Sequence, residues 1–275
     1  MRVLAINDVS CVGKCSLTAA LPIISACGVE CTVLPTAILS THTGGFTGYT
    51  FRDLTEDIDG ILRHWKSLDL KFEYILSGYL GSIEQIELVS LVKKEFLADG
   101  GKFIVDPVMG DGGTLYAGFT DAYVEKMRAL CAEADFILPN VTEACFLSRL
   151  PYPLTKANAG LALERLTALC PAPVVTGLTD ETGIAVLYKD ETGKTQSVSH
   201  ENVEGFFCGA GDVFASAFVG CLASGKNAAD SISLAADFVA AVIRRSAKEV
   251  PDKRFGLNFE KELFPFLQKL FSANN

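Results

Sequence analysis

Short apolar runs that alternate with helical patterns constrain the fold of this 275-residue chain more than any other feature. Each run is typical of a buried strand, and most of them end in small polar residues or glycine. Strands are predicted at 2–6, 30–34, 74–76, 103–105, 136–138 and 173–177. Because strands that alternate with helices favour a parallel sheet with helices on both faces, we predict a three-layer α/β/α sandwich, with residues 1–275 forming a single domain.

Apolar residues at helical spacing fill the segments between these strands. Helices are predicted at 16–27, 51–68, 83–98, 122–134, 157–169, 212–222, 228–245 and 259–271, and a hairpin at 183–188 and 194–200. In open α/β sheets, ligands bind beyond the carboxyl ends of the strands. The polar clusters that follow the strands are therefore the candidate functional residues.

Charge and cysteine content exclude several classes of function. The formal net charge of −9 argues against a nucleic-acid or anionic membrane surface. No apolar stretch reaches the length of a membrane span, and the first residues do not resemble a signal peptide. The odd count of nine cysteines, scattered through predicted elements, indicates a reduced cytoplasmic protein in which the thiols pack as small apolar residues.

The stretch 206–214 carries the strongest chemical signal, because Gly209-Ala210-Gly211-Asp212 leads into an apolar helix. Unpartnered N–H groups at the start of a helix bind phosphate or an oxyanion. We interpret Asp212 as a base that removes a proton from a substrate hydroxyl while the glycine turn holds the charge on a transferring phosphoryl group. The alternative is an ordinary acidic residue in the first turn after a glycine hinge.

Carboxylates also follow the strand at 103–105. Asp106 and Asp111 lie in a glycine-rich loop and could hold Mg²⁺, which prefers oxygen ligands, or could simply serve turn geometry. After the next strand, Asn140 or Thr142 could cap the following helix, and Glu143 could instead face the water shell of a metal ion.

Two polar segments near the N-terminus are candidates for substrate binding. Asn7, Asp8 and Ser10 follow the first predicted strand and are expected at the edge of a site. The glycine-rich segment 39–49 contains His42 and Thr43. It is either a flexible surface connection or a loop that presents hydroxyls and an imidazole to a small polar substrate.

The order of these motifs resembles the ribokinase-like superfamily, and within it the pyridoxal (pyridoxine, pyridoxamine) kinases. The resemblance extends over nearly the whole chain. Its motifs are Asp106–Asp111, Pro139–Glu143, Thr176-Gly177, Gly209–Asp212, Asn7–Gly13 and Ser40–Gly44. The last of these departs from the usual pattern, because Thr41 stands where that family has Asn.

The resemblance implies ATP-dependent phosphorylation of the hydroxymethyl group of vitamin B6 forms, with Mg²⁺ and a monovalent cation such as K⁺ or Na⁺. It implies a homodimer, and a flap over ATP between Gly177 and Gly205. Its implied catalytic base is Asp212, with the anion hole at Gly209, Ala210 and Gly211. The implied ATP and metal residues are Asp106, Asp111, Asn140, Glu143 and Thr176. The implied ring-binding residues are Asp8 or Ser10, together with Thr43.

Alternative functions stay open at this point. An Asp at position 8 also resembles the hydroxymethylpyrimidine kinases of thiamine synthesis, so a pyrimidine kinase or a dual-specificity enzyme is the nearest rival. A sugar kinase is less favoured, and a non-catalytic nucleotide-binding protein on the same fold is the rival from another class. Cys208, next to the glycine turn, either packs as a small apolar residue or adds to an aldehyde substrate.

Overall fold

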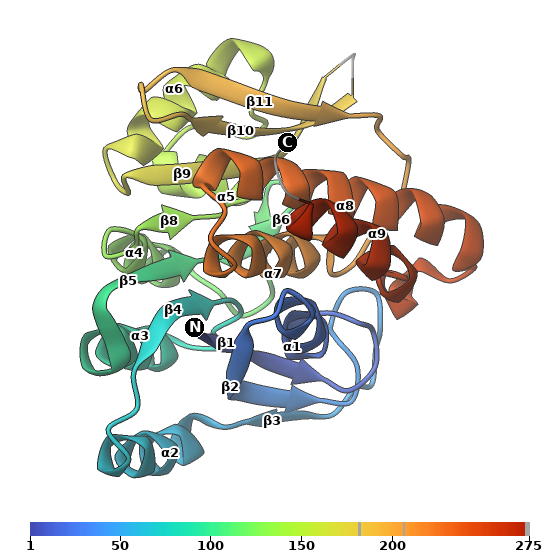
Figure 1. Ribbon diagram of the computed structural model, residues 1–275. Helices are drawn as coiled ribbons and strands as arrows, with labels where there is room; N and C mark the ends of the chain where they lie inside the picture. Colours follow the sequence, from blue (N-terminus) through green and yellow to red (C-terminus); the bar gives the residue numbers. More distant parts are fainter. Residues whose placement is uncertain (181–182, 206, 273–275) are drawn as a thin grey trace.

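Nine strands in the described residues form one twisted sheet in the computed structural model, which describes residues 1–180, 183–205 and 207–272. The strand order is β11-β10-β9-β8-β5-β4-β1-β2-β3 (Figure 1). Neighbouring strands are parallel from β2 to β9. These parallel strands are β1 (Arg2–Ser10), β2 (Glu30–Leu39), β4 (Phe72–Ser77), β5 (Leu97–Val105), β8 (Phe136–Ile137) and β9 (Ala172–Asp180).

The two edges of the sheet are antiparallel. At one edge β3 (Phe51–Asp53) pairs with β2, and at the other β10 (Gly183–Lys189) and β11 (Thr195–His200) form a hairpin that extends β9. The hairpin confirms the pattern read from the sequence. It lies between Gly177 and Gly205, the segment expected to hold the flap over ATP. Residues 181–182 of that segment are outside the described part of the chain.

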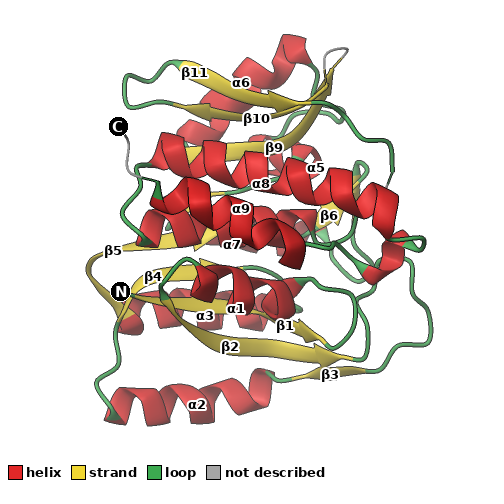
Figure 2. Cartoon of the chain, turned by 45° about the vertical axis from the view of Figure 1, so that its right-hand side comes forward, coloured by secondary structure: helices red, strands yellow, loops and turns green. Residues whose placement is uncertain are grey.

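Helices cover both faces of the sheet, which confirms the predicted three-layer sandwich (Figure 2). One face carries α2 (Thr55–Ser67), α3 (Ile83–Phe96), α4 (Asp121–Cys131), α5 (Val141–Ser148) and α6 (Lys156–Thr167). The other carries α1 (Ser16–Ala26), α7 (Ala210–Ala223), α8 (Ala228–Glu249) and α9 (Glu260–Phe271). No helix in the described ranges is long and apolar enough to cross a membrane.

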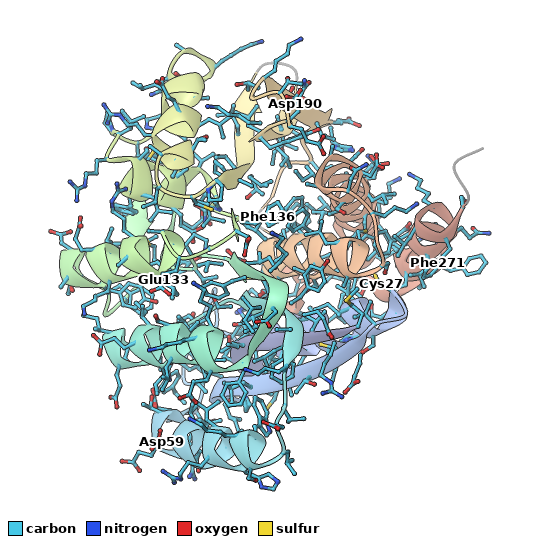
Figure 3. The ribbon with its side chains drawn as sticks, turned by 60° about the vertical axis from the view of Figure 1, so that its left-hand side comes forward. Cys27, Asp59, Glu133, Phe136, Asp190 and Phe271 are labelled. Carbon is cyan, nitrogen blue, oxygen red and sulfur yellow. The ribbon has the colours of Figure 1, made fainter. Side chains whose placement is uncertain are left out.

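Each helix layer packs its own apolar core against the sheet. Phe136 of β8 meets Phe218 of α7 edge to face at 5.3 Å between ring centroids. In Figure 3 the labelled Phe136 lies between the layers, whereas Asp59 and Glu133 lie at the outer surface. Burial of apolar area on both faces is the main stabilising contribution to such a sandwich.

Three local predictions need correction. The first strand does not end at Ile6 but continues to Ser10, because the polar side chains beyond Ile6 are buried with hydrogen-bond partners. The expected helix at 51–68 begins only at Thr55, since 51–53 pair with β2 as β3. The glycine-rich loop after β5 contains an unpredicted small hairpin, β6 (Gly110–Asp111) and β7 (Thr114–Leu115).

Candidate active site

Asn7, in the second half of β1, contacts the carboxylate of Asp212. Its side-chain oxygen accepts hydrogen bonds from the backbone N–H groups of Asp8 and Tyr79, both at 2.9 Å. The amide nitrogen must therefore point the other way, where it donates to Asp212 Oδ1 at 3.1 Å. Gly78 leaves room for this side chain, because a Cβ there would lie 2.3 Å from the Asn7 nitrogen. Asn7 thus orients the carboxylate through a fixed donor.

The turn that opens α7 requires glycine at position 209. Gly209 has φ +83°, in the left-handed region, and a Cβ there would lie 2.9 Å from the carbonyl oxygen of Lys14. Gly209 is the residue before the helix, and its own carbonyl accepts from Val213 N–H at 2.9 Å. The predicted glycine turn into a helix is confirmed.

Backbone N–H groups at this turn remain available to a ligand. Within the described part of the chain, those of Gly211 and Asp212 have no protein acceptor, and that of Ala210 makes only a long contact of 3.4 Å to Phe207. The helix dipole adds partial positive charge at the same point. This geometry suits an anion, as expected for the glycine stretch.

The Asp212 carboxyl lies at the first turn of α7, partly exposed, and its pKa is raised from 3.8 to about 6. Burial is the main cause of the raised pKa, and a hydrogen bond from the Ser16 backbone N–H partly opposes it. The negative charge of Asp8 raises the pKa further, whereas the hydrogen bond from the Asn7 amide lowers it. A carboxyl with this pKa is ionised at neutral pH and can accept a proton. It also borders a cavity of about 10 Å³, at the lower limit of the space that holds one water molecule, next to Asp106.

Asp8 and Ser10 form a buried pair at the end of β1. Ser10 Oγ donates to one oxygen of Asp8 at 2.9 Å, and Ser16 Oγ donates to the other at 2.6 Å. Burial raises the pKa of Asp8. Thr43, by contrast, is exposed in the loop after β2. Of the residues expected to bind the ring, Asp8 and Ser10 are therefore buried and contact each other. Thr43 belongs to a different loop and is exposed.

The loop after β2 lies beside the glycine turn of α7. Cys208, the residue before Gly209, places its sulfur 3.7 Å from His42 Nδ1 and 3.7 Å from the carbonyl oxygen of Gly44. His42 Nδ1 accepts the Gly44 N–H at 3.0 Å.

Burial raises the pKa of the Cys208 thiol to about 11, so the neutral thiol prevails at neutral pH. All nine cysteines are free thiols, as the sequence predicts.

Asp106, Asp111 and Glu143 lie at the carboxyl ends of β5 and β8, but the structure does not gather them into a closed cluster. Among the described residues no group of three or more His, Cys, Asp or Glu is placed to hold a metal ion. Asp106 is buried, and its pKa is raised well above 3.8 by burial, then by the charges of Glu143 and Asp212. Asp111 is exposed.

Glu143 is held by the backbone. Its two oxygens accept the N–H groups of Met109 at 3.0 Å and Asn140 at 2.9 Å, and the Asn140 side chain accepts the Glu143 N–H in return. This capping box confirms Asn140 as the cap of α5. Burial raises the pKa of Glu143 to about 8.

A large pocket of about 710 Å³ opens beside this capping box. It contains the predicted Asp111 and Asn140, and Thr176 lies next to it because it bridges to Asn140 in parallel register. The other side of the pocket is formed by Gly177, which belongs to the predicted Thr176-Gly177 motif, and by residues 152–156 and Thr179, which the sequence did not single out. Residues 152–156 lead into the start of α6 and carry no sequence pattern that distinguishes them from other residues before a helix.

Comparison with known proteins decides the family. The sequence profile of the phosphomethylpyrimidine kinase family matches residues 13–254. The chain belongs to the phosphomethylpyrimidine kinase family. These are kinases of the ribokinase type, which confirms the kinase family and the fold inferred from the order of the motifs.

Several solved structures support the assignment to this kinase family. A Bacteroides thetaiotaomicron protein assigned to the phosphomethylpyrimidine kinases, in a crystal form with pyridoxal, is 33% identical, with TM-score 0.90 over 96% of this chain and 95% of that one. Pyridoxal kinase of Lactobacillus plantarum is 32% identical, with TM-score 0.90 over 98% and 97%. Pyridoxal kinase of Leishmania donovani, in complex with ADP and pyridoxine, is 24% identical, with TM-score 0.85 over 99% and 97%, and shows the shared fold.

Proposed function

We propose that this protein transfers the γ-phosphoryl group of ATP to the hydroxymethyl oxygen of pyridoxal, pyridoxine or pyridoxamine. The observation that carries the proposal is the position of Asp212. Its carboxylate is oriented by the Asn7 amide and lies in the first turn of α7, where the N–H groups of Gly211 and Asp212 lack protein acceptors in the described chain. Proton acceptor and anion site are thus adjacent.

The arrangement supports an in-line transfer. The substrate oxygen forms a bond to the γ-phosphorus, the bond from that phosphorus to the ADP oxygen breaks, and the hydroxyl proton passes to Asp212. The N–H groups at Gly211 and Asp212 would stabilise charge on the phosphoryl oxygens. With its pKa near 6, Asp212 is ionised at neutral pH and needs no further activation.

The carboxylates of the site fit a magnesium–nucleotide complex. Asp8, Asp106, Asp111, Glu143 and Asp212 form no ion pair with a basic side chain anywhere in the described ranges. Mg²⁺ binds one or two carboxylates and completes its shell with water and phosphate oxygens, so it needs no cage of protein ligands.

Under the proposal, Asp106 and Asp111 are the carboxylates for Mg²⁺, and Glu143 acts through water because its oxygens already accept backbone N–H groups. When bound, the ion neutralises phosphate charge. Asn140 and Thr176 would contact nucleotide at the edge of the large pocket. The proposal also includes a monovalent cation, K⁺ or Na⁺, and a homodimer.

Acceptor recognition is assigned to the loops after β1 and β2. Asp8 or Ser10 would meet polar atoms of the pyridine ring, and Thr43 is exposed for a further contact. The pyridoxal bound by the Bacteroides protein and the name of the Lactobacillus enzyme favour a B6 acceptor. The family profile itself supports the second candidate, a hydroxymethylpyrimidine kinase.

A panel of acceptors tests the proposal. Purified protein with ATP and Mg²⁺ is assayed for ADP release on pyridoxal, pyridoxine, pyridoxamine and hydroxymethylpyrimidine, with product phosphate confirmed by mass spectrometry. We expect turnover on at least one B6 form to exceed that on the pyrimidine. A higher kcat/KM for the pyrimidine would establish the second candidate, and ATP binding without turnover on any alcohol would indicate a non-catalytic protein.

A further inference from the structure

The turn between α8 and α9 is built as a fixed support. Residues Lys253–Phe255 form a short 3₁₀ helix, and the Arg254 guanidinium pairs with Asp252 at 2.7 Å. The Lys253 ammonium closes the C-terminal end of α8 by donating to three backbone carbonyls at 2.7–2.8 Å, those of Ser246, Ala247 and Val250. The turn is therefore tied to a helix of the core.

This turn holds the loop after β2 through Arg254. The backbone carbonyl of Arg254 lies 2.6 Å from His42 Nε2, which must carry the proton because His42 Nδ1 accepts from Gly44. The guanidinium carbon lies 5.1 Å from the ring centroid of Phe46, and one nitrogen donates to the Gly45 carbonyl at 3.3 Å. A partly exposed cation–π contact of this kind contributes about 0.5–1 kcal/mol.

Aromatic contacts continue from the loop to the same turn. Phe46 meets Phe255 edge to face at 5.4 Å between centroids and meets the His42 ring at 5.1 Å. His42 in turn packs so closely on Gly13 that a Cβ there would lie 2.2 Å from the imidazole. The loop is therefore packed on residues from both ends of the chain.

The turn also contacts the segment before α1. A Cβ at Gly256, which has φ +81°, would lie 1.8 Å from the carbonyl oxygen of Gly13. The loops after β1 and after β2, both on the acceptor side of the proposed site, thus rest on residues 252–256. None of the residues that line the 710 Å³ pocket belongs to this turn.

We propose that Arg254 is a positioning residue for the acceptor substrate. It fixes the 40–46 loop, and with it Thr43 and His42, against the turn that carries Cys208 and Gly209. This inference rests on the proposed function, since it assigns the loop to acceptor binding. Because Arg254 contacts the acceptor-side loop and not the nucleotide pocket, its loss should weaken acceptor binding selectively.

The test compares Arg254→Ala and Arg254→Lys with the control Arg63→Ala. Arg63 also forms an exposed ion pair, within α2, with Asp59, which lies at the outer surface in Figure 3. Hydrogen exchange of residues 40–48 is measured first, in the protein without ligands. We expect the Gly44 amide to exchange about two- to fivefold faster in Arg254→Ala, which keeps the backbone carbonyl that His42 contacts but loses the guanidinium contacts. We expect an intermediate rate in Arg254→Lys and no change in the control.

Kinetics with pyridoxal and ATP then separate positioning from folding. In Arg254→Ala we expect the KM for pyridoxal to rise about two- to fivefold while the KM for ATP stays unchanged. Unchanged exchange, or faster exchange with an unchanged pyridoxal KM, would overturn the inference. An equal rise in both KM values with a lowered Tm would also overturn it, because that pattern indicates general destabilisation.

The two proposals fail in different ways. If the wild-type protein phosphorylates none of the three B6 forms, the proposed function is refuted, and the exchange rates alone decide whether Arg254 holds the loop. If the wild type is active and Arg254→Ala behaves like the Arg63 control in both measurements, the proposed function stands and the role of Arg254 is refuted.

Discussion

Replacing Asp212 with Asn should separate catalysis from binding and folding. The amide has nearly the same shape and can still accept the hydrogen bond from Asn7, but it cannot take a proton. We expect kcat to fall by roughly 10²–10⁴, the range for a lost general base. That range corresponds to about 2.7–5.4 kcal/mol of transition-state stabilisation.

The raised pKa of Asp212 gives a second, independent expectation for the same variant. Because burial lifts the pKa from 3.8 to about 6, ionisation in the folded protein is disfavoured. The stability contribution of this carboxyl is fully present below pH 3.8 and is lost as the pH rises through about 6. A shift of about two units corresponds to about 3 kcal/mol, which partial exposure reduces to about 1–2 kcal/mol. Asp212→Asn should therefore be more stable than wild type at pH 8.

The assay measures ADP release between pH 5 and 9, together with ATP affinity by calorimetry and unfolding by denaturant. In the wild type, kcat/KM for the acceptor should fall tenfold per unit below pH 6, and Asp212→Asn should lack this limb. Asp59→Asn, an exposed acidic residue on α2, is the matched control. A kcat within a few-fold of wild type, or lower stability at pH 8, would refute the reasoning.

Three further substitutions test the surroundings of this carboxyl. Asn7→Ala removes the donor that lowers the pKa of Asp212, so the acidic limb of kcat/KM should move to higher pH, with kcat about tenfold lower; an unmoved limb would contradict this. Glu143→Ala leaves two buried N–H groups without acceptors, so a loss of about 1–3 kcal/mol in unfolding free energy and a higher Mg²⁺ requirement are expected; an unchanged Mg²⁺ titration would remove Glu143 from the site. Gly209→Ala forces φ +83° on alanine against the Lys14 carbonyl, so turnover should fall and unfolding free energy drop by about 1–3 kcal/mol; wild-type turnover would show that the turn tolerates a side chain.

The sheet and its helices could be predicted because their signals are local. Apolar runs, helical spacing and glycine turns each report on a few neighbouring residues, and α7 begins where Gly209 indicates. The polar residues after each strand were found for the same reason, since the carboxyl ends of parallel strands meet at one edge. Asn140 and Glu143 illustrate the limit, because the sequence allowed both a capping box and a metal role, and the structure shows the capping box.

Features that depend on distant partners could not be predicted. Residues 51–53 form a strand only because β2 offers an open edge, and β1 continues past Ile6 only because Ser16 and Tyr79 satisfy its buried polar groups. The 253–255 turn had no recognisable pattern. Its significance comes from contacts with residues more than 200 positions earlier in the chain.

The negative charge of the site affects whether ATP can bind free or only in complex with a metal ion. Each ionised carboxylate of the site, such as Asp212, would repel the phosphates of free ATP by about 1–4 kcal/mol at 4 Å, depending on solvent access. The raised pKa values of Asp106 and Glu143 express the same repulsion, in addition to burial. A divalent cation bound with the nucleotide would offset it and lower both pKa values. Under the proposed function we therefore expect metal-bound ATP, rather than free ATP, to be the form that enters the site.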